Sequence, residues 1–234
     1  MDPAALVAGL RWRERAAPGA RPHVVAAMIA TADGRAAIAG KSVALGHPQD
    51  RALLRGLRAE ADGVLVGTPT IRAERYANPL DEDQRAARAA AGRSRLPLIA
   101  TVTRSGDVPW DVGLFADPDV HVVIFTAVPL EIPPGCAATV DVERHTAGLP
   151  HVVARLGEAY GVRALLSEGG PRLLGALAAE GLVDELFLTV APLLAAGDAP
   201  TPLHGPPLDP PARLALHDVQ RADDHLFLHY LASR

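Results

Sequence analysis

An acidic residue stands directly before two glycines and a proline at Glu168-Gly169-Gly170-Pro171. The apolar run at residues 164–167 predicts a strand, and Pro171 suits the first position of a helix that continues through Arg172, Leu173 and Leu174. Paired glycines let the backbone approach a ligand closely, and the first N–H groups of a helix can bind an anion such as a nucleotide pyrophosphate. An ordinary tight turn has the same pattern, so both interpretations stay open here.

Other patterns predict the elements that would position this turn. Short apolar runs predict strands, and apolar residues at helical spacing predict the helices between them. We expect strands at residues 23–30, 63–67, 96–102, 120–125, 138–142, 164–167 and 183–190, and helices at 48–60, 149–160 and 171–180. Alternating segments at 213–218 and 225–231 predict an antiparallel hairpin. The order is typical of an α/β fold with a mostly parallel sheet.

Composition limits the class of protein. The 234 residues are 49% hydrophobic in separated clusters, which predicts a single domain over residues 21–234 after a lead-in at 1–20, and no membrane span. A net charge of −4 with scattered arginines argues against a nucleic-acid partner. The lone Cys136 and the histidine spacing predict no metal site, and the N-terminus lacks a secretory pattern, so we expect a cytoplasmic location.

Five segments, in this order, resemble the reductase domain of riboflavin biosynthesis, a family similar in fold to dihydrofolate reductase. They are residues 28–35, 58–72, 98–103, 167–171 and 181–186, the last followed by Ala191-Pro192. The resemblance covers the chain from about Arg21 to its end. It implies a three-layer α/β/α fold and an enzyme like 5-amino-6-(5-phosphoribosylamino)uracil reductase. Such an enzyme takes hydride from NADPH and passes it to a pyrimidine-ribosylamine or pteridine-like substrate.

The resemblance also assigns cofactor positions. Residues 169–174 would line the pyrophosphate, and the family implies a cis peptide between Gly169 and Gly170. Gly67, Thr68 and Thr70 would lie on another flank of the cofactor, where the alternative is a plain capping turn. Thr103 and Arg104 would lie beside the adenosine ribose. The Arg104 guanidinium could bind the 2′-phosphate of NADPH, or be a solvated surface arginine.

Acidic residues are the candidates for catalysis. Hydride addition to an imine leaves a nitrogen that needs a proton, and a partly desolvated carboxyl can donate one. The resemblance implies that role for Asp33, which also fits a common Asp-Gly turn, and for Glu168, which would touch substrate as well. Ser42 and Glu74 are the other expected substrate residues.

Departures from the family pattern bear on the substrate. The usual Asp-Asp-Pro-x-Leu run with its following arginine is replaced at residues 74–80, and Ala44 stands where a tryptophan is usual. Arg72 or Arg75 is a candidate replacement for the missing arginine. The alternatives are a related enzyme with a different substrate and a nucleotide-binding module without turnover. The apolar C-terminal hairpin leads us to expect a homodimer.

Overall fold

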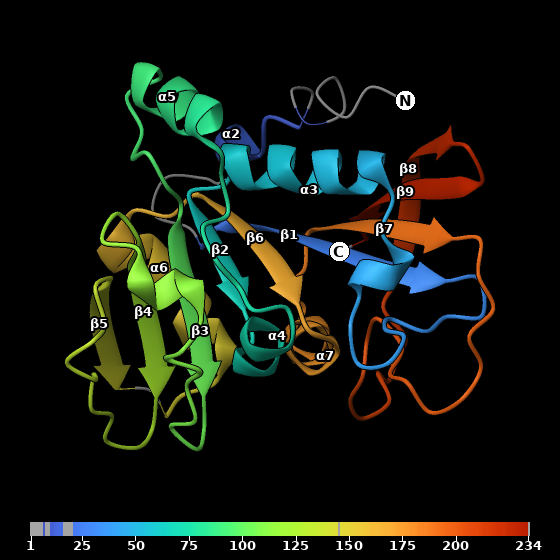
Figure 1. The fold of residues 1–234 in the computed structure, drawn as a ribbon. Helices are drawn as coiled ribbons and strands as arrows, with labels where there is room; N and C mark the ends of the chain where they lie inside the picture. Colours follow the sequence, from blue (N-terminus) through green and yellow to red (C-terminus); the bar gives the residue numbers. More distant parts are fainter. Residues whose placement is uncertain (1–6, 8–9, 16–20, 145, 234) are drawn as a thin grey trace.

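A nine-stranded sheet, ordered β5-β4-β3-β2-β6-β1-β7-β9-β8, runs through the molecule (Figure 1). The computed structural model describes residues 7, 10–15, 21–144 and 146–233. Six strand pairs are parallel, and only β7–β9 and β9–β8 are antiparallel among the described strands. The strands are β1 (His23–Thr31), β2 (Gly63–Val66), β3 (Leu98–Thr103), β4 (His121–Thr126), β5 (Thr139–Arg144), β6 (Ala164–Gly169), β7 (Glu185–Ala191), β8 (Leu214–Ala222) and β9 (His225–Ala232).

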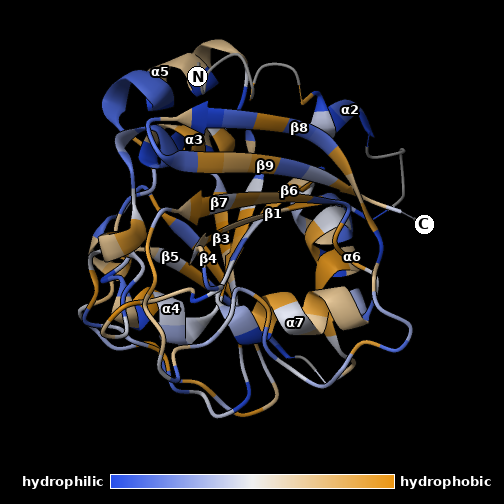
Figure 2. Ribbon diagram, turned by 90° about the vertical axis from the view of Figure 1, so that its right-hand side faces the viewer, coloured by the Kyte–Doolittle hydropathy of each residue, from blue (hydrophilic) through white to orange (hydrophobic). Residues whose placement is uncertain are grey.

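Helices cover both faces of the sheet. On one face, Leu53 and Leu57 of α3 join a core cluster with alternate strand residues, and on the other, Val152 of α6 and Leu177 of α7 join a second cluster. The central strands are hydrophobic, as their orange colour in Figure 2 shows. The helices are α2 (Trp12–Arg15), α3 (Pro48–Glu60), α4 (Thr68–Ala73), α5 (Glu82–Ala90), α6 (Leu149–Tyr160) and α7 (Pro171–Ala179), with 3₁₀ turns η1 (Val43–Leu45) and η2 (Gly113–Ala116).

This architecture confirms the predicted α/β/α layers, the mostly parallel sheet and the antiparallel C-terminal hairpin. Several strands begin or end one or two residues away from the predicted bounds. Two larger differences concern α5 and β8. Helix α5, begun by a capping box between Asp81 and Gln84, was not predicted, because its small, charged residues lack a strong apolar repeat. Strand β8 extends beyond the predicted 213–218 because a register shift between Leu216 and Asp218 lets pairing with β9 continue.

The predicted lead-in contributes to the core. Residues 1–6, 8–9 and 16–20 lie outside the described residues, but Val7, Leu10 and Trp12 are buried in the same cluster as α3. A Cβ on Gly56 of α3 would lie 3.0 Å from Val7, so the two segments pack closely. The boundary predicted at Arg21 therefore does not mark the edge of the core. Among the described residues, no helix is long and apolar enough to span a bilayer.

Candidate functional site

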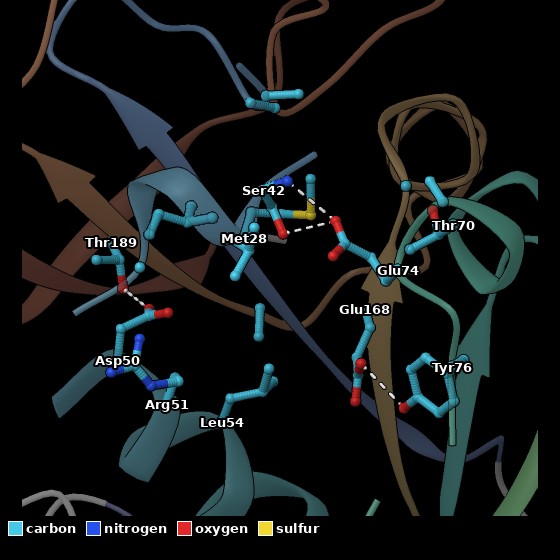
Figure 3. Close-up of a pocket in the computed structure, with 18 of the residues that line it drawn as sticks. Met28, Ser42, Asp50, Arg51, Leu54, Thr70, Glu74, Tyr76, Glu168 and Thr189 are labelled. Carbon is cyan, nitrogen blue, oxygen red and sulfur yellow. Dashed lines mark hydrogen bonds between the residues drawn. The ribbon is translucent and has the colours of Figure 1, made fainter. Parts of the chain in front are cut away.

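A cavity of about 620 Å³ opens at the carboxyl ends of β1, β6 and β7, between α3 and the end of α4 (Figure 3). Ligands of open α/β sheets bind at this edge, next to the point where the strand order reverses. Here β6 inserts between β2 and β1, which places the reversal at the cavity. The charged residues that line it are Asp50, Arg51, Arg58, Glu74, Arg75 and Glu168.

The glycine turn forms one wall of this cavity through Gly170 and Pro171. The Gly169–Gly170 peptide is cis, which confirms the prediction, and Gly169 has a φ of +69°. The Gly67 N–H donates to the Gly169 carbonyl at 2.7 Å, so the ends of β2 and β6 are joined here. A Cβ on Gly170 would lie 2.7 Å from the Thr70 hydroxyl. Only glycine therefore fits at position 170 without displacing the Thr70 hydroxyl.

Helix α7 begins directly after the turn. Gly170 is its N-cap and makes no side-chain capping bond, and Pro171 stands at the first helical position. The first N–H groups of a helix have no partner inside it, so those of Arg172 and Leu173 are available to an anion. The Arg172 side chain is exposed, whereas Leu174 is buried against the body of the protein.

The remaining predicted cofactor residues lie along the same edge of the sheet. Thr68 is buried at the start of α4, and Thr70 lines the cavity. Thr103 ends β3, beside β2, and its hydroxyl accepts a bond of 3.1 Å from the Gly106 N–H. Arg104 follows it, exposed, and is in none of the ion pairs found among the described residues. The fold thus aligns all these positions in one row.

Glu168 owes its direction to an irregularity in the sheet. Leu65 of β2 pairs with Ser167, but the next residue, Val66, pairs with Gly169, so Glu168 is an extra residue in β6. Such a bulge re-aims the side chain that it carries. The Glu168 carboxylate accepts hydrogen bonds from Nε and Nη2 of Arg58 at 2.6 and 2.7 Å. It accepts a third from the Tyr76 hydroxyl at 3.0 Å.

This cluster is largely desolvated. The side chains of Arg58 and Glu168 are 18% and 7% exposed, and the guanidinium lies over the Tyr76 ring, 5.1 Å from its centre. Burial lowers the pKa of Arg58, but the adjacent Glu168 carboxylate raises it by more, so the Arg58 pKa lies above its usual value. Burial and the same carboxylate raise the pKa of Tyr76 well above its usual value. The cluster therefore holds a fixed ion pair with a neutral phenol.

Ser42 and Glu74, both expected at the substrate, contact each other across the cavity mouth. The Ser42 N–H and hydroxyl donate to Glu74 Oε1 at 3.0 and 2.8 Å. Glu74 is the C-cap of α4, and Ser42 precedes η1. The serine orients the carboxylate, whose other oxygen has no protein partner among the described residues (Figure 3).

Asp50 is a cavity residue that the sequence reading missed. It lies in the first turn of α3, and the Thr189 hydroxyl on β7 donates to its Oδ1 at 2.6 Å (Figure 3). Burial raises the pKa of Asp50, opposed by the Thr189 bond and by the charges of His225, Arg51 and His47. A carboxyl of this kind retains its proton to a higher pH than an ordinary aspartate and can donate it.

Asp33 lies outside the residues that line the cavity, in the turn after β1. It is exposed, and its carboxylate accepts bonds from the Thr31 hydroxyl and from the N–H groups of Ala195 and Ala196. These bonds lower the pKa of Asp33 to about 2. The structure thus separates Asp33 from Glu168, with which it was grouped as a catalytic candidate.

The substituted segment at residues 74–80 shapes the mouth of the cavity. Arg75 lines it and binds Asp111 at 2.6 Å, whereas Arg72 binds Asp107 and does not line it. Both pairs are at least half exposed. Tyr76 turns inward, and its hydroxyl donates to Glu168.

Long-range pairing explains the missed residues. Arg58, Asp50 and Tyr76 were given no role from the sequence, because each acts through a partner on another element. The sequence signals present were the first-turn position of Asp50 in the helix predicted at residues 48–60 and the place of Arg58 at the start of the segment 58–72.

Comparison with known proteins agrees with this geometry. Residues 22–228 match the family model described as RibD C-terminal domain. The riboflavin biosynthesis protein RibD of Mycobacterium tuberculosis is 30% identical over 179 residues, 75% of this chain and 44% of that protein, so the chain spans less than half of that relative. The 2,5-diamino-6-ribosylamino-4(3H)-pyrimidinone 5′-phosphate reductase of Methanothermobacter thermautotrophicus is 27% identical over 86% of this chain and 93% of its own.

Solved structures show the same fold. A pyrimidine reductase-like protein from Corynebacterium diphtheriae superposes over the full length of both chains with a TM-score of 0.82 and 23% identity. Dihydrofolate reductase from Enterococcus faecalis, complexed with NADP(H), gives a TM-score of 0.50 and 14% identity over 91% of this chain and 97% of its own. The dihydrofolate-reductase-like fold expected from the sequence is therefore confirmed, and the chain belongs to the RibD C-terminal domain family.

Proposed function

We propose that this protein is an NADPH-dependent reductase that transfers hydride to a pyrimidine-ribosylamine or pteridine-like substrate. One observation carries the proposal. The glycine turn, through Gly170 and Pro171, lines the same cavity as the carboxyl groups of Asp50 and Glu74. A dinucleotide on the turn and a ring substrate between the carboxyls would therefore meet in one cavity. The names of the relatives support the same reaction class.

The residues present fit a dinucleotide. A Cβ on Gly170 would fill the space next to Thr70, and the start of α7 presents N–H groups to a diphosphate. The proposed contacts are Gly67, Thr68, Thr70, Thr103, Arg104 and residues 169–174. Arg104 would bind the 2′-phosphate and so favour NADPH over NADH. Bound there, NADPH supplies the hydride, and the protein supplies position and charge.

The carboxyl groups of the cavity divide the remaining tasks. We assign proton donation to Asp50, because burial raises the pKa of its carboxyl and the residue lines the cavity. Glu168 is held as an ion pair by Arg58, which makes it a fixed acceptor for substrate N–H groups rather than a donor. Glu74, oriented by Ser42, provides a second acceptor on the facing wall. Such a site suits a ring that carries amino or ring N–H donors.

A substrate phosphate would have Arg75 as its partner at the cavity mouth. Arg75 is 63% exposed and its bond to Asp111 is a surface pair, and such pairs contribute little stability. A doubly charged phosphate can therefore replace the aspartate.

A single-turnover experiment tests the function. The protein, saturated with NADPH, is mixed with 5-amino-6-(5-phosphoribosylamino)uracil, 2,5-diamino-6-ribosylamino-4(3H)-pyrimidinone 5′-phosphate, dihydropterin or dihydrofolate, and absorbance at about 340 nm reports cofactor oxidation. A reductase oxidises NADPH with at least one of these compounds. A nucleotide-binding module binds NADPH, seen by fluorescence, and oxidises it with none. Absence of NADPH binding overturns the proposal.

The proposal includes a homodimer. Strand β8 is an edge of the sheet, and its hairpin exposes Leu214, Leu216, Val219 and Leu226. Unpaired edge strands with apolar side chains are suited to pairing with a second copy. Light scattering should give about twice the chain mass of 24.5 kDa, and a mass of 24.5 kDa would contradict the dimer.

A further inference from the structure

The segment after β7 lies against the turn after β1. We call residues 192–204 the strap and residues 32–36 the first loop. In Figure 1 the orange chain that follows β7 runs beside the blue chain that follows β1. Three bonds join them besides those of Asp33: Ala32 N–H to the Leu193 carbonyl at 2.9 Å, Ala36 N–H to the Pro200 carbonyl at 2.8 Å, and Arg35 Nη1 to the Ala199 carbonyl at 3.0 Å.

Asp33 accepts hydrogen bonds from the turn at residues 195–197 of the strap. Its Oδ1 accepts the Ala195 N–H at 3.1 Å and its Oδ2 accepts the Ala196 N–H at 2.7 Å. Ala196 and Gly197 both have left-handed backbones, with φ values of +53° and +68°. A turn of this kind directs successive N–H groups to one side, where a carboxylate can accept both. Because alanine is disfavoured at positive φ, the turn depends on that acceptor.

The far end of the strap rests on the glycine-turn helix. The His204 N–H donates to the Pro171 carbonyl at 3.0 Å. A Cβ on Gly175 of α7 would lie 2.3 Å from the His204 carbonyl oxygen, so the strap passes directly over the helix at a glycine. Pro200, between these two ends, lines the cavity together with Ala36 of the first loop and the adjacent Ala37. The strap therefore contributes Pro200 to the lining of the cavity.

Little apolar burial holds the strap in place. Most of residues 192–200 are exposed, and Leu194 is 84% exposed. Segments with few buried contacts open at a small cost in free energy, so individual hydrogen bonds decide their position.

We propose that Asp33 is a positioning residue, whose carboxylate fixes the strap over the cavity and so sets the affinity of the cavity for its substrate. The expected effect on substrate affinity rests on the proposed function. The contact between Asp33 and the strap does not, because hydrogen exchange measures it in the free protein. The low pKa of Asp33 agrees with it, since an ionised carboxylate accepts both N–H groups and has no proton to donate at neutral pH.

Hydrogen exchange of the free protein tests the contact. Asp33→Asn keeps the side-chain size but turns an amide N–H₂ toward one strap N–H. We expect exchange of the strap amides to become about tenfold faster in Asp33→Asn, with the strands unchanged. Asp198→Asn is the matched control, because Asp198 is an exposed acid of the same strap with no hydrogen bond found among the described residues. Equal exchange in both variants overturns the proposal, and Asp33→Ala repeats the measurement if Asp33→Asn does not fold.

Steady-state kinetics separate positioning from proton donation. We expect Asp33→Asn to raise KM for the substrate about tenfold, with kcat within about twofold of the original and the pH profile unshifted. A fall in kcat of about a hundredfold with an altered pH profile would instead make Asp33 the proton donor and overturn the proposal. If no substrate oxidises NADPH, the proposed function fails, while the exchange result still decides whether Asp33 holds the strap.

Discussion

The two sides of the cavity are built in different ways. The glycine-turn side consists of the backbone at Gly170 and Pro171, which are adjacent in the chain. The opposite side consists of side chains whose partners are far apart in the chain: Ser42 and Glu74 by 32 residues, Arg58 and Glu168 by 110, and Asp50 and Thr189 by 139. A site made of backbone depends on which residues are glycine, whereas a site made of paired side chains depends on charge and protonation.

The largest effect should come from Asp50→Asn, on the side of the cavity that is built from paired side chains. The amide keeps the shape but has no acidic proton, so we expect kcat to fall about a thousandfold while NADPH affinity is unchanged. In the original protein, burial raises the pKa of Asp50, and Thr189, His225, Arg51 and His47 face it. Because the protonated form is active, kcat should fall as pH rises through that raised pKa.

The measurement is kcat against pH, and Asp50→Asn should lose this limb. Asp83→Asn, on the exposed surface of α5, serves as the control. An Asp50→Asn enzyme as fast as the original would assign the proton to another group.

Next in size is Arg58→Met, which leaves Glu168 charged and nearly buried. Breaking a buried ion pair at one partner costs about 3 to 5 kcal/mol of the free energy of unfolding. Urea denaturation measures this loss. Adding Glu168→Leu should restore most of the stability but not the turnover. If the double variant regains turnover, the Arg58–Glu168 pair serves folding alone and is not part of the substrate site.

On the backbone side, Gly170→Ala should weaken NADPH binding about a hundredfold, about 2.7 kcal/mol. The added methyl group would approach Thr70 Oγ1 to 2.7 Å and narrow the space for the diphosphate. Fluorescence titration gives the affinity. Gly205→Ala is the control, since its Cβ would meet no atom within 4 Å. Equal affinities in both variants would mean that the diphosphate does not approach this peptide.

The smallest effect should come from Arg104→Ala. Loss of one exposed phosphate contact should weaken NADPH binding about tenfold and leave NADH binding unchanged. The ratio of the two dissociation constants is the readout, with Arg55→Ala, on the exposed side of α3, as the control. If both cofactors weaken equally, Arg104 holds a part that they share and the 2′-phosphate is bound elsewhere.

The same contrast explains what the sequence could predict. The glycine turn, the order of the strands and helices, and the C-terminal hairpin were predictable because local patterns specify them. The cis peptide at the turn was expected only from the family resemblance. Arg58, Tyr76 and Thr189 could not be assigned, because their roles exist only where α3, residue 76 and β7 converge on the cavity. Asp33 stood in a motif, but its partners are about 160 residues away. Only the fold shows that they belong to the strap.

The extra residue in β6 makes this site sensitive to chain length. Deleting Glu168, the extra residue of β6, would let the ladder with β2 run without interruption. Arg58 and Tyr76 would then lose the Glu168 carboxylate to which both donate hydrogen bonds. Substitutions around the cavity would leave this anchor in place, whereas a single deletion in β6 would remove it at once.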